Sequence, residues 1–452
     1  MADLDAIFKA YDVRGTYPDQ IDAPACRRIG AAFVTMLRAE LGDLDRVVVG
    51  RDMRPSGVEL VAAFIDGATS QGVDVVDLGL ASTDMLYYAA GSLGVPGAVF
   101  TASHNPAGYN GIKMCRAGAV PIGAESGLVA IKELARTDRP PAATTGKVEE
   151  LDLLDAFADH VRSFIDVDTL APLKVVADTA NGMGGLVVPA VFAGLPIELD
   201  ILYPELDGTF PNHPADPLDA DNLVDLCARV LEIGADIGLA FDGDADRVFL
   251  VDEQAQPVSG SLTTAMVAAG MLEANPGATV IHNLICSKTV PEVIAENGGK
   301  AVRSRVGHSF IKGLMAETDA VFAGEHSGHY YFRDNYRADS GLIAALVVLE
   351  QLSKADTALS ELRKPFERYV ASGEINTVVD DQQAVIARIA EAHADADLDH
   401  LDGLTVDHGD WWFNVRPSNT EPLLRLNLEA PDAAAMTRRV AEIRALMVGS
   451  GE

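Results

Sequence analysis

The chain repeats one pattern of apolar strands and helices three times, and this repeat restricts its fold more than any other feature. In the first copy, an apolar run at 46–50 is followed by a helical stretch at 58–70 and a second apolar run at 73–78. The same order recurs at 173–202 and at 279–306. Strand–helix–strand units of this length form right-handed crossovers between parallel strands. The repeat therefore predicts three similar α/β domains with mixed, mainly parallel sheets.

Each unit is followed by one more apolar run that ends in a polar loop. These runs lie at 98–100, 236–241 and 320–323. Ligands bind at the carboxyl ends of strands in open parallel sheets. We therefore expect the three loops to face one central cleft.

The final part of the chain has a different pattern. Short strands with turns and a helix at 433–447 predict a smaller C-terminal α+β domain, preceded by a helix at 360–369. A chain of 452 residues is also too long for one ordinary core. The predicted domains are 1–145, 146–255, 256–368 and 369–452.

Charge and cysteine usage exclude several kinds of partner. The formal net charge of −32 argues against nucleic acid and anionic membranes, because both require basic surfaces. The four cysteines are scattered, which is typical of a reduced, cytoplasmic protein, and the N-terminus lacks the regions of a signal peptide. No apolar stretch approaches the ~20 residues of a membrane span, and the longest, 342–349, is expected to be a buried helix. The sequence leaves monomer and homodimer open.

Ser103 lies in a polar, turn-rich loop at 101–110, directly after an apolar run, and Lys113 follows closely. A serine hydroxyl needs a base, a metal or a prior phosphorylation before it reacts. The alternative is that Ser103 and Asn105 only shape a turn, as serine and asparagine commonly do. Taken alone, the loop favours the turn, and the other motifs of the chain favour a reactive serine.

Asp242, Asp244 and Asp246 alternate along a short segment, which can point three carboxylates to one side. Oxygen ligands of this kind favour Mg²⁺ or Ca²⁺ over zinc. An EF-hand is rejected, because its sixth position should be glycine and is Arg247, and because the flanking residues are typical of strands. A solvated acidic turn is the remaining alternative, but apolar strands on both sides favour a metal site with a phosphoryl group as the further ligand.

Further residues offer groups that suit a sugar phosphate. Glu325 and Ser327 can bind neutral hydroxyl groups, and His308 and His329 are candidate acid or base groups. A donor-rich loop suits a phosphate, although a proline-bounded turn would look the same; it contains Arg416, Ser418, Asn419 and Thr420. Arg14 is a candidate second phosphate ligand.

Taken together, these motifs resemble the α-D-phosphohexomutase superfamily, and the resemblance covers essentially the whole chain. It depends on the order of four motifs and on two supporting ones, which lie at 101–106, 242–247, 324–329 and 416–420, and at 11–15 and 109–113. The segments 329–334 and 339–341 look most like the branch of phosphomannomutases and dual-specificity phosphomannomutase/phosphoglucomutases. His326, where phosphoglucosamine mutases commonly have glutamine, makes that activity a less favoured expectation.

The resemblance implies a mutase that passes a phosphoryl group between Ser103 and a phosphorylated hexose through a hexose 1,6-bisphosphate, which serves as intermediate and activator. Mg²⁺, one per chain, would be held by Ser103 and the three aspartates. Lys113 is the implied acid and base, with a pKa expected to be lowered by cationic neighbours or a metal, and His104, His308 and His329 are further catalytic candidates.

The implied substrate contacts lie on several motifs, and they are Arg14, Arg247, Glu325, Ser327, Arg416, Ser418, Asn419 and Thr420. Mannose phosphate is the expected substrate. A dual-specificity enzyme or a phosphoglucomutase is the alternative, because one hydroxyl at C2 discriminates weakly. A phosphatase and a non-catalytic sugar-phosphate-binding protein are remoter alternatives.

Overall fold

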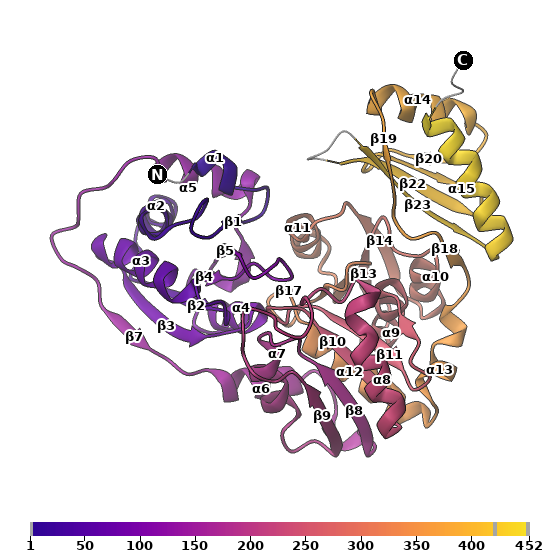
Figure 1. Ribbon diagram of the computed structural model, residues 1–452, viewed down its shortest axis with the longest axis horizontal. Coiled ribbons are helices and arrows are strands. Elements are labelled where there is room, and N and C mark those ends of the chain that lie inside the picture. The colour runs from indigo at the N-terminus through magenta and orange to yellow at the C-terminus, as the bar shows by residue number, and fades with distance from the viewer. Residues whose placement is uncertain (1–2, 419–422, 449–452) are drawn as a thin grey trace. The chain divides into compact units, whose positions relative to one another are not determined.

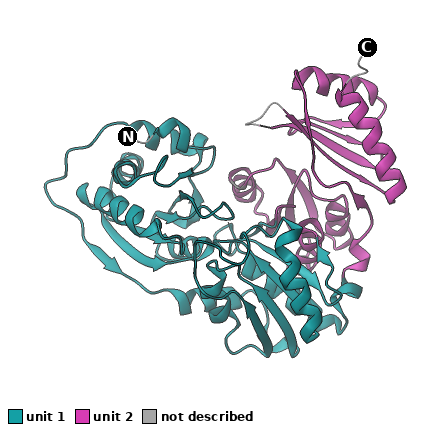
Figure 2. Cartoon of the chain, in the orientation of Figure 1, with its two compact units in different colours: residues 1–258, 328–362 teal, residues 259–327, 363–452 magenta. Residues whose placement is uncertain are grey.

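The computed structural model describes residues 3–418 and 423–448. Two compact units make up the chain, each assembled from two segments (Figure 2). Unit 1 contains the residues up to 258 together with 328–362, and unit 2 contains 259–327 together with the residues from 363 onward. The boundaries of the four predicted domains stay a prediction.

The first sheet of unit 1 is mixed and mainly parallel, as predicted. Its strands follow the order β1-β5-β4-β2-β3-β7, in which β4, β2, β3 and β7 are parallel and β5 and β1 are antiparallel to their neighbours. The strands are β1 (Val13–Thr16), β2 (Arg46–Arg51), β3 (Asp74–Leu80), β4 (Gly97–Phe100), β5 (Tyr109–Arg116) and β7 (Val148–Glu150), with the short β6 (Val120–Pro121) paired to β5. This order places the loop from β4 to β5 at the carboxyl end of β4.

Helices α2 (Ala23–Leu41) and α3 (Gly57–Ser70) lie side by side in unit 1 (Figure 1). Two glycines permit the close approach. A Cβ on Gly30 would lie 2.2 Å from the carbonyl oxygen of Phe64, and one on Gly67 would lie 2.0 Å from that of Arg27. The ring centroid of Phe64 on α3 lies 5.8 Å from that of Phe33 on α2 and 5.5 Å from that of Phe100 at the end of β4. The helix pair therefore fixes the strand that leads into the Ser103 loop.

The second sheet of unit 1 repeats the plan in the order β12-β11-β10-β8-β9. Its strands are β8 (Leu173–Asp178), β9 (Ile197–Leu202), β10 (Ile237–Phe241), β11 (Val248–Asp252) and β12 (Pro257–Val258). The parallel crossover from β8 to β9 passes through α7 (Gly184–Phe192), and α8 (Val224–Ile233) leads into β10. Strands β10 and β11 form an antiparallel hairpin in which Phe241 pairs with Val248. The three aspartates occupy the turn of this hairpin.

Unit 1 also contains several elements from later in the chain. Strands β16 (Tyr330–Phe332) and β17 (Ala338–Asp339) pair antiparallel and lead into α12 (Gly341–Ala355). Ser340 caps α12 by accepting a hydrogen bond from the backbone N–H of Ile343, and residues 342–349 are buried, as expected. Helix α4 (Thr83–Ser92) contacts β17, and α12 contacts both α6 (Leu154–Arg162) and β11.

Unit 2 contains the third strand–helix–strand repeat. Strand β13 lies between β14 and β15, and all three are parallel. The elements are β13 (Thr279–Asn283), β14 (Lys300–Ser304), β15 (Phe322–Gly324), α9 (Gly260–Ala274), α10 (Thr289–Glu296) and α11 (His308–Thr318). The polar turn with Glu325 follows β15 directly, as the pattern predicts.

The C-terminal part of unit 2 is an antiparallel sheet with two helices, which confirms the predicted α+β arrangement. Its strands are β18 (Val370–Ala371), β19 (Ile375–Val378), β20 (Asp397–Asp399), β21 (Leu404–Asp407), β22 (Trp412–Pro417) and β23 (Leu423–Ala430). The helices α14 (Gln382–Ala392) and α15 (Ala433–Val448) contact each other, and Ile389 and Ile443 are buried in the core beside Phe413.

The expected helix at 360–369 is wrong. The structure has the short helix α13 (Leu359–Leu362), a tight turn at Lys364–Phe366 and then β18. Pro365 explains the break, because proline lacks the backbone N–H that a helix needs and disfavours helical geometry at the residue before it. Among the described residues, no helix is both long and apolar enough to cross a membrane. With this local exception, the predicted fold class is confirmed.

Candidate active site

Ser103 sits in the loop between β4 and β5 and is 5% exposed. Its φ of +48° is unusual for a residue with a side chain. The conformation is fixed locally, because the backbone N–H of Ser103 donates to Thr101 Oγ1 at 2.9 Å and that of Asn105 donates to the carbonyl of Ala102 at 2.9 Å. Asparagine and serine therefore shape a turn here, as the alternative interpretation supposed, and the same turn presents the Ser103 hydroxyl.

Arg54 binds the backbone of this loop, and the sequence analysis did not predict this role. Its guanidinium is fully buried and pairs with Asp52, with 3.2 Å between Arg54 Nε and Asp52 Oδ2. Both terminal nitrogens donate to backbone carbonyls of the loop at 2.6–3.0 Å, namely those of Ser103, Asn105, Pro106 and Tyr109. Burial lowers the pKa of Arg54, while Asp52 opposes that shift. A single side chain therefore satisfies four carbonyl groups of the Ser103 loop.

Asp242, Asp244 and Asp246 come together at the tip of the β10–β11 hairpin, and each is at most 1% exposed. One carboxylate oxygen from each lies within 4.8 Å of the others. Oδ1 of Asp244 and Oδ1 of Asp246 are buried and accept no hydrogen bond from the part of the chain that the structure describes. Buried oxygens are normally satisfied, so this pair suits a bound cation. The all-oxygen donor set fits a hard divalent ion.

Ser103 contacts this cluster directly. Its Oγ donates to Asp242 Oδ2 at 2.6 Å. Arg247 binds the same oxygen through Nε at 2.9 Å, and its Nη2 lies 3.4 Å from Ser103 Oγ. Burial and the nearby Asp244 and Asp246 raise the pKa of Asp242 to about 7, against the effect of Arg247. The predicted serine, its acidic partner and the predicted Arg247 therefore form one connected group.

Lys113 on β5 contacts two of the three aspartates. Its ammonium lies 2.7 Å from Asp244 Oδ2 and 2.6 Å from Asp246 Oδ2. Burial lowers the pKa of Lys113, but the two carboxylates more than offset this effect, and the net pKa lies well above the usual value. The expected lowering of this pKa is therefore wrong for this arrangement: the nearest charges are anions, and Lys113 is a protonated cation.

Two histidines lie beside the same group. His104 Nδ1 is 3.3 Å from Ser103 Oγ and accepts from Arg247 Nη2 at 2.6 Å. Burial, followed by Arg247 and Arg14, lowers the pKa of His104 to about 3, so the ring is neutral. His329 Nδ1 lies 2.9 Å from Asp339 Oδ2 and 3.9 Å from Asp246 Oδ1. These carboxylates raise its pKa against the effect of burial.

Thr83, at the start of α4, is a second residue that sequence reasoning missed. It is fully buried, and its Oγ1 donates to Asp244 Oδ2 at 2.6 Å. Its backbone N–H donates to the carbonyl of Asp244 at 3.2 Å. Thr83 and Lys113 together occupy Oδ2 of Asp244, whereas its buried Oδ1 has no donor among the described residues. The only sequence signal is a capping serine, Ser82, which marks the start of a helix.

Arg14 on β1 contacts residues of the Ser103 loop. Its Nη1 donates to Asn105 Oδ1 at 2.5 Å and lies 3.3 Å from the carbonyl oxygen of Ala102, while its Nη2 pairs with Asp12 at 2.5 Å. Arg14 therefore supports the Ser103 loop, and its binding of phosphate stays a prediction.

The other predicted site residues belong to unit 2. Glu325 is 3% exposed and accepts hydrogen bonds from Asn283 Nδ2 at 3.2 Å and the backbone of Gly307 at 3.4 Å. Ser327 follows in the same turn, and His308 is the first residue of α11. Arg416, on β22, pairs with Glu374 at 2.9 Å.

The backbone N–H of Ser418 donates to the carbonyl of Leu423 at 2.9 Å. Asn419 and Thr420 lie outside the described residues. That the site residues of both units face one cleft stays a prediction.

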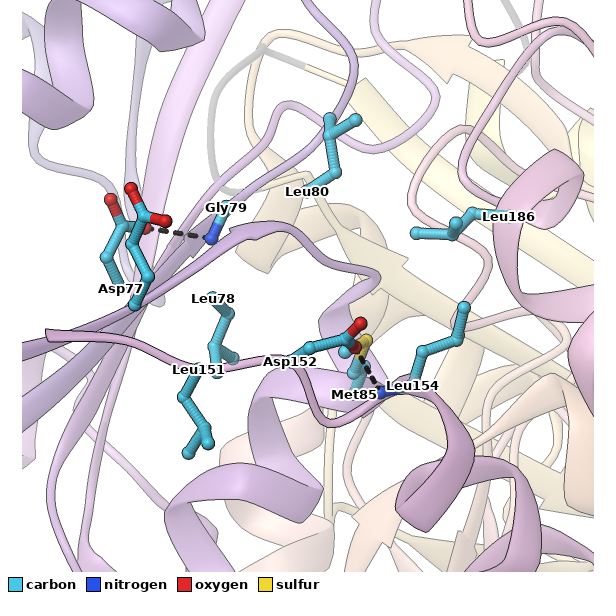
Figure 3. A pocket seen from close by; sticks show the side chains of 10 residues that line it. Asp77, Leu78, Gly79, Leu80, Met85, Leu151, Asp152, Leu154 and Leu186 are labelled. Carbon is cyan, nitrogen blue, oxygen red and sulfur yellow. Dashed lines mark hydrogen bonds between the residues drawn. The ribbon is translucent and has the colours of Figure 1, made fainter.

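Unit 1 also contains a cavity of about 520 Å³ (Figure 3). None of the predicted site residues lines it. Two of its carboxylates are already engaged, because Asp77 accepts from the backbone N–H of Gly79 at 2.8 Å and Asp152 accepts from that of Leu154 at 3.0 Å. The candidate active site therefore lies at the Ser103 loop, and this cavity contains none of its predicted residues.

The four domain models of one family match the chain in order. They are described as phosphoglucomutase/phosphomannomutase α/β/α domains I, II and III and the C-terminal domain, and they match residues 5–140, 155–256, 259–369 and 374–446. The chain belongs to the phosphoglucomutase/phosphomannomutase family. The resemblance drawn from its motifs is thereby confirmed.

Relatives within the phosphoglucomutase/phosphomannomutase family match over nearly their whole length. A phosphomannomutase of Salmonella montevideo is 40% identical over 97% of this chain and 98% of its own length. A Xanthomonas campestris protein named phosphohexose mutases is 38% identical over 98% of this chain and 99% of its own length. The crystal structure of a family protein from Burkholderia thailandensis, 34% identical, superposes with a TM-score of 0.89 over 99% of this chain and 97% of that one.

Proposed function

We propose that this protein is a phosphohexomutase that interconverts mannose 6-phosphate and mannose 1-phosphate through a phosphorylated Ser103. The observation that carries the proposal is the 2.6 Å contact of Ser103 Oγ with Asp242, one of three clustered buried carboxylates, of which Asp244 and Asp246 each have one oxygen without a donor in the described chain. The names of the relatives, phosphomannomutase and phosphohexose mutases, support the substrate class.

The reaction has two balanced phosphoryl transfers. The bond between phosphorus and Ser103 Oγ breaks as a bond forms from phosphorus to a hydroxyl oxygen of the hexose phosphate, and the proton of that hydroxyl leaves. The product is a hexose 1,6-bisphosphate, which is the intermediate and, when added from outside, the activator. Its other phosphate then returns to Ser103, so no phosphate is released.

The residues around Ser103 supply charge and proton transfer. One Mg²⁺ per chain, held by Asp242, Asp244, Asp246 and the Ser103 oxygen, supplies positive charge to the phosphoryl group when it is bound. Arg247, beside Ser103, stabilises the same negative charge. Lys113 is protonated, and it therefore donates a proton to the serine oxygen as that oxygen leaves. His104, His308 and His329 are the candidate acceptors of the hydroxyl proton.

The substrate contacts follow from the remaining residues. Glu325 and Ser327 bind sugar hydroxyls, and Arg14 binds a phosphate. Arg416 and Ser418, with Asn419 and Thr420, bind the phosphate that is not reacting. We propose that the enzyme is cytoplasmic, works as a monomer or homodimer, and has no nucleic-acid or membrane partner. Dual specificity for mannose and glucose phosphates is the second candidate function, favoured by the relative named phosphohexose mutases.

A side-by-side assay of the mannose and glucose phosphates tests the proposal. Isomerisation of mannose 1-phosphate with conserved total phosphate supports a mutase, and equal rates on both sugars support dual specificity. Release of inorganic phosphate as the main product would instead identify a phosphatase. The intact mass should show one covalent phosphate that is absent from Ser103→Ala. A Ser103→Ala protein that isomerises at the wild-type rate would refute the mechanism.

A further inference from the structure

Asp84, in the first turn of α4, is a fully buried carboxyl group that the proposed reaction does not use. Its Oδ1 accepts hydrogen bonds from Ser82 Oγ at 2.5 Å and from the backbone N–H of Met85 at 2.9 Å. Its Oδ2 accepts from Ser340 Oγ at 2.8 Å. Both serine side chains are themselves fully buried. Each oxygen of this carboxyl group therefore has a partner that is fixed in place.

The two serine partners cap two helices that are far apart in the sequence. Ser82 caps α4, where its Oγ accepts from the backbone N–H of Met85 at 3.2 Å. Ser340 caps α12 and accepts in the same way from Ile343 at 3.3 Å. It lies 256 residues from Asp84 in the chain. A single buried carboxyl group thus joins the N-termini of α4 and α12.

Each of these helix starts also holds a group of the candidate active site. At the start of α4, Thr83 binds the side chain of Asp244 through its hydroxyl at 2.6 Å and the backbone carbonyl of Asp244 through its N–H at 3.2 Å. Directly before the cap of α12, Asp339 Oδ2 lies 2.9 Å from Nδ1 of His329. The junction therefore lies between a residue of the metal cluster and a candidate proton acceptor.

The first residue of α12 packs against the turn that carries the three aspartates. A Cβ on Gly341 would lie 2.7 Å from the carbonyl carbon of Arg247 and 2.9 Å from the backbone nitrogen of Val248. No side chain fits at such distances, so the backbones of the two segments touch. The turn is thus in contact with the starts of both helices.

A carboxyl group is a costly choice for this junction. Burial raises the pKa of Asp84 to about 7; the hydrogen bonds from Ser82 and Ser340 oppose this shift, and the charge of Asp246 adds to it. An apolar side chain would fill the space without the cost of desolvation, and such replacements often leave a protein equally stable. A carboxyl group between two hydroxyl groups instead fixes the distance and direction between the two helix starts, which apolar contacts do not.

We propose that Asp84 is a positioning residue that holds Asp244 of the metal cluster and His329 in one geometry through the starts of α4 and α12. It acts through its partners in the two segments, Thr83 and Ser340. The inference deepens the proposed function and rests on it, because phosphoryl transfer requires the metal cluster and the proton acceptor to be aligned at the same time. A misplacement of about 1 Å can lower a rate about 100-fold, so the link should act on kcat more than on substrate affinity.

Ser340→Ala breaks the link on the side of α12. Its kcat for mannose 1-phosphate should fall about 10- to 100-fold, while KM stays within about threefold of the wild type. Its affinity for Mg²⁺, measured by calorimetry, should also stay within about threefold, because Thr83 still binds Asp244. The matched control is Ser259→Ala, which removes the serine cap of α9, a helix that has the same 15 residues as α12 and also begins with glycine. A wild-type kcat in Ser340→Ala, or an equal loss of kcat in Ser259→Ala, would overturn the inference.

Two substitutions of Asp84 separate a link from a charge. In Asp84→Asn the amide can accept from Ser82 and donate to Ser340 Oγ, so kcat should stay within about threefold of the wild type. Asp84→Ala has neither group and should lose kcat as Ser340→Ala does. The double variant should be no slower than the slower single variant, because both substitutions remove one link. Equal losses in Asp84→Asn and Asp84→Ala, or losses that add in the double variant, contradict a positioning role.

Hydrogen exchange measures the same link without turnover. In Asp84→Ala, peptides that cover residues 328–341 should exchange faster, although they lie far from the substitution in the sequence, and Ser259→Ala should leave their exchange unchanged. If the wild type isomerises neither sugar phosphate but these peptides exchange faster, the mutase activity is wrong and the link stands. If the wild type isomerises and the variants exchange and turn over like it, the link is wrong and the mutase stands. If circular dichroism shows that Asp84→Ala does not fold, Ser340→Ala and Asp84→Asn still decide.

Discussion

Replacing Arg54 with lysine should destabilise unit 1 and loosen the loop that carries Ser103. The guanidinium of Arg54 contacts five acceptors, which are Asp52 and four loop carbonyls. A lysine ammonium has three donors at a single point, so at least two of the five acceptors lose their partner. Each buried acceptor left without a donor costs about 1–3 kcal/mol, which gives about 2–6 kcal/mol for Arg54→Lys.

The assay must report on unit 1. Both tryptophans, Trp411 and Trp412, lie in unit 2, so their fluorescence does not follow the Ser103 loop. Hydrogen exchange of peptides that cover residues 101–110 should accelerate in Arg54→Lys, and urea unfolding followed by circular dichroism should show the lower free energy of unfolding. Arg46→Lys, at the exposed start of β2, is the matched control and should change neither quantity. Arg54→Lys with wild-type exchange and stability would refute the role of the buried guanidinium.

Three further predictions follow from the contacts of single residues. Thr83→Val keeps the shape of Thr83 but removes one of the two side-chain donors that orient the Asp244 carboxylate, so calorimetry should find Mg²⁺ affinity reduced about 10- to 100-fold, with rescue by Thr83→Ser; an unchanged affinity would remove Thr83 from the site. Gly67→Ala should destabilise the protein, because its Cβ would meet the backbone of Arg27. Gly313→Ala in α11 has open space around the new Cβ and should stabilise the protein by up to ~1 kcal/mol in thermal unfolding. Equal effects of the two substitutions would contradict the packing argument. The pKa of His213 is raised, because its contact with Asp178 outweighs burial, so its stabilising effect is complete below the unfolded pKa and is lost as pH rises through the folded pKa. His213→Gln should therefore cost more free energy of unfolding at about pH 5 than at about pH 9, and the opposite order would exclude this pair as a source of pH dependence.

The fold was predictable from the sequence wherever apolar periodicity determines it. The runs at 46–50, 173–178 and 279–284 became the parallel strands β2, β8 and β13, because buried strands need continuous apolar residues. The expected helix at 360–369 failed because Pro365 overrides the helical pattern locally. Periodicity describes the average preference of a segment, and a single proline decides where that segment ends.

Parts of the candidate site were predictable for a different reason, namely that their residue types are unusual for a turn. Three alternating aspartates between apolar strands indicate a ligand set even without a structure. Arg54 and Thr83 could not be found in this way, because their partners lie 49 and 161 residues away in the chain. An arginine or threonine after a strand looks like any surface residue until the fold places a carbonyl or carboxylate opposite it.

The pKa of Lys113 shows the same limit for electrostatics. Its closeness to Ser103 in sequence predicted that it lies near the Ser103 loop, but the direction of its pKa shift depends on Asp244 and Asp246, which are 131 and 133 residues away. The sequence suggested a cationic neighbourhood, whereas the fold supplies two anions. The sign of a pKa shift depends on the nearest charges in space, and the sequence does not give those distances.

The local charges explain how a protein of net charge −32 can hold a phosphorylated serine. With all three aspartates ionised, the net charge of the cluster is −1, because Lys113 and Arg247 offset two of the three negative charges. A phosphoryl group on Ser103 adds about −2 and would place this charge against Asp242, whose carboxylate lies 2.6 Å from the serine oxygen. Binding of one divalent cation changes the net charge of the cluster to +1 before phosphorylation and to about −1 after it. Phosphorylation of Ser103 and binding of the cation must therefore strengthen each other, since each compensates the charge that opposes the other.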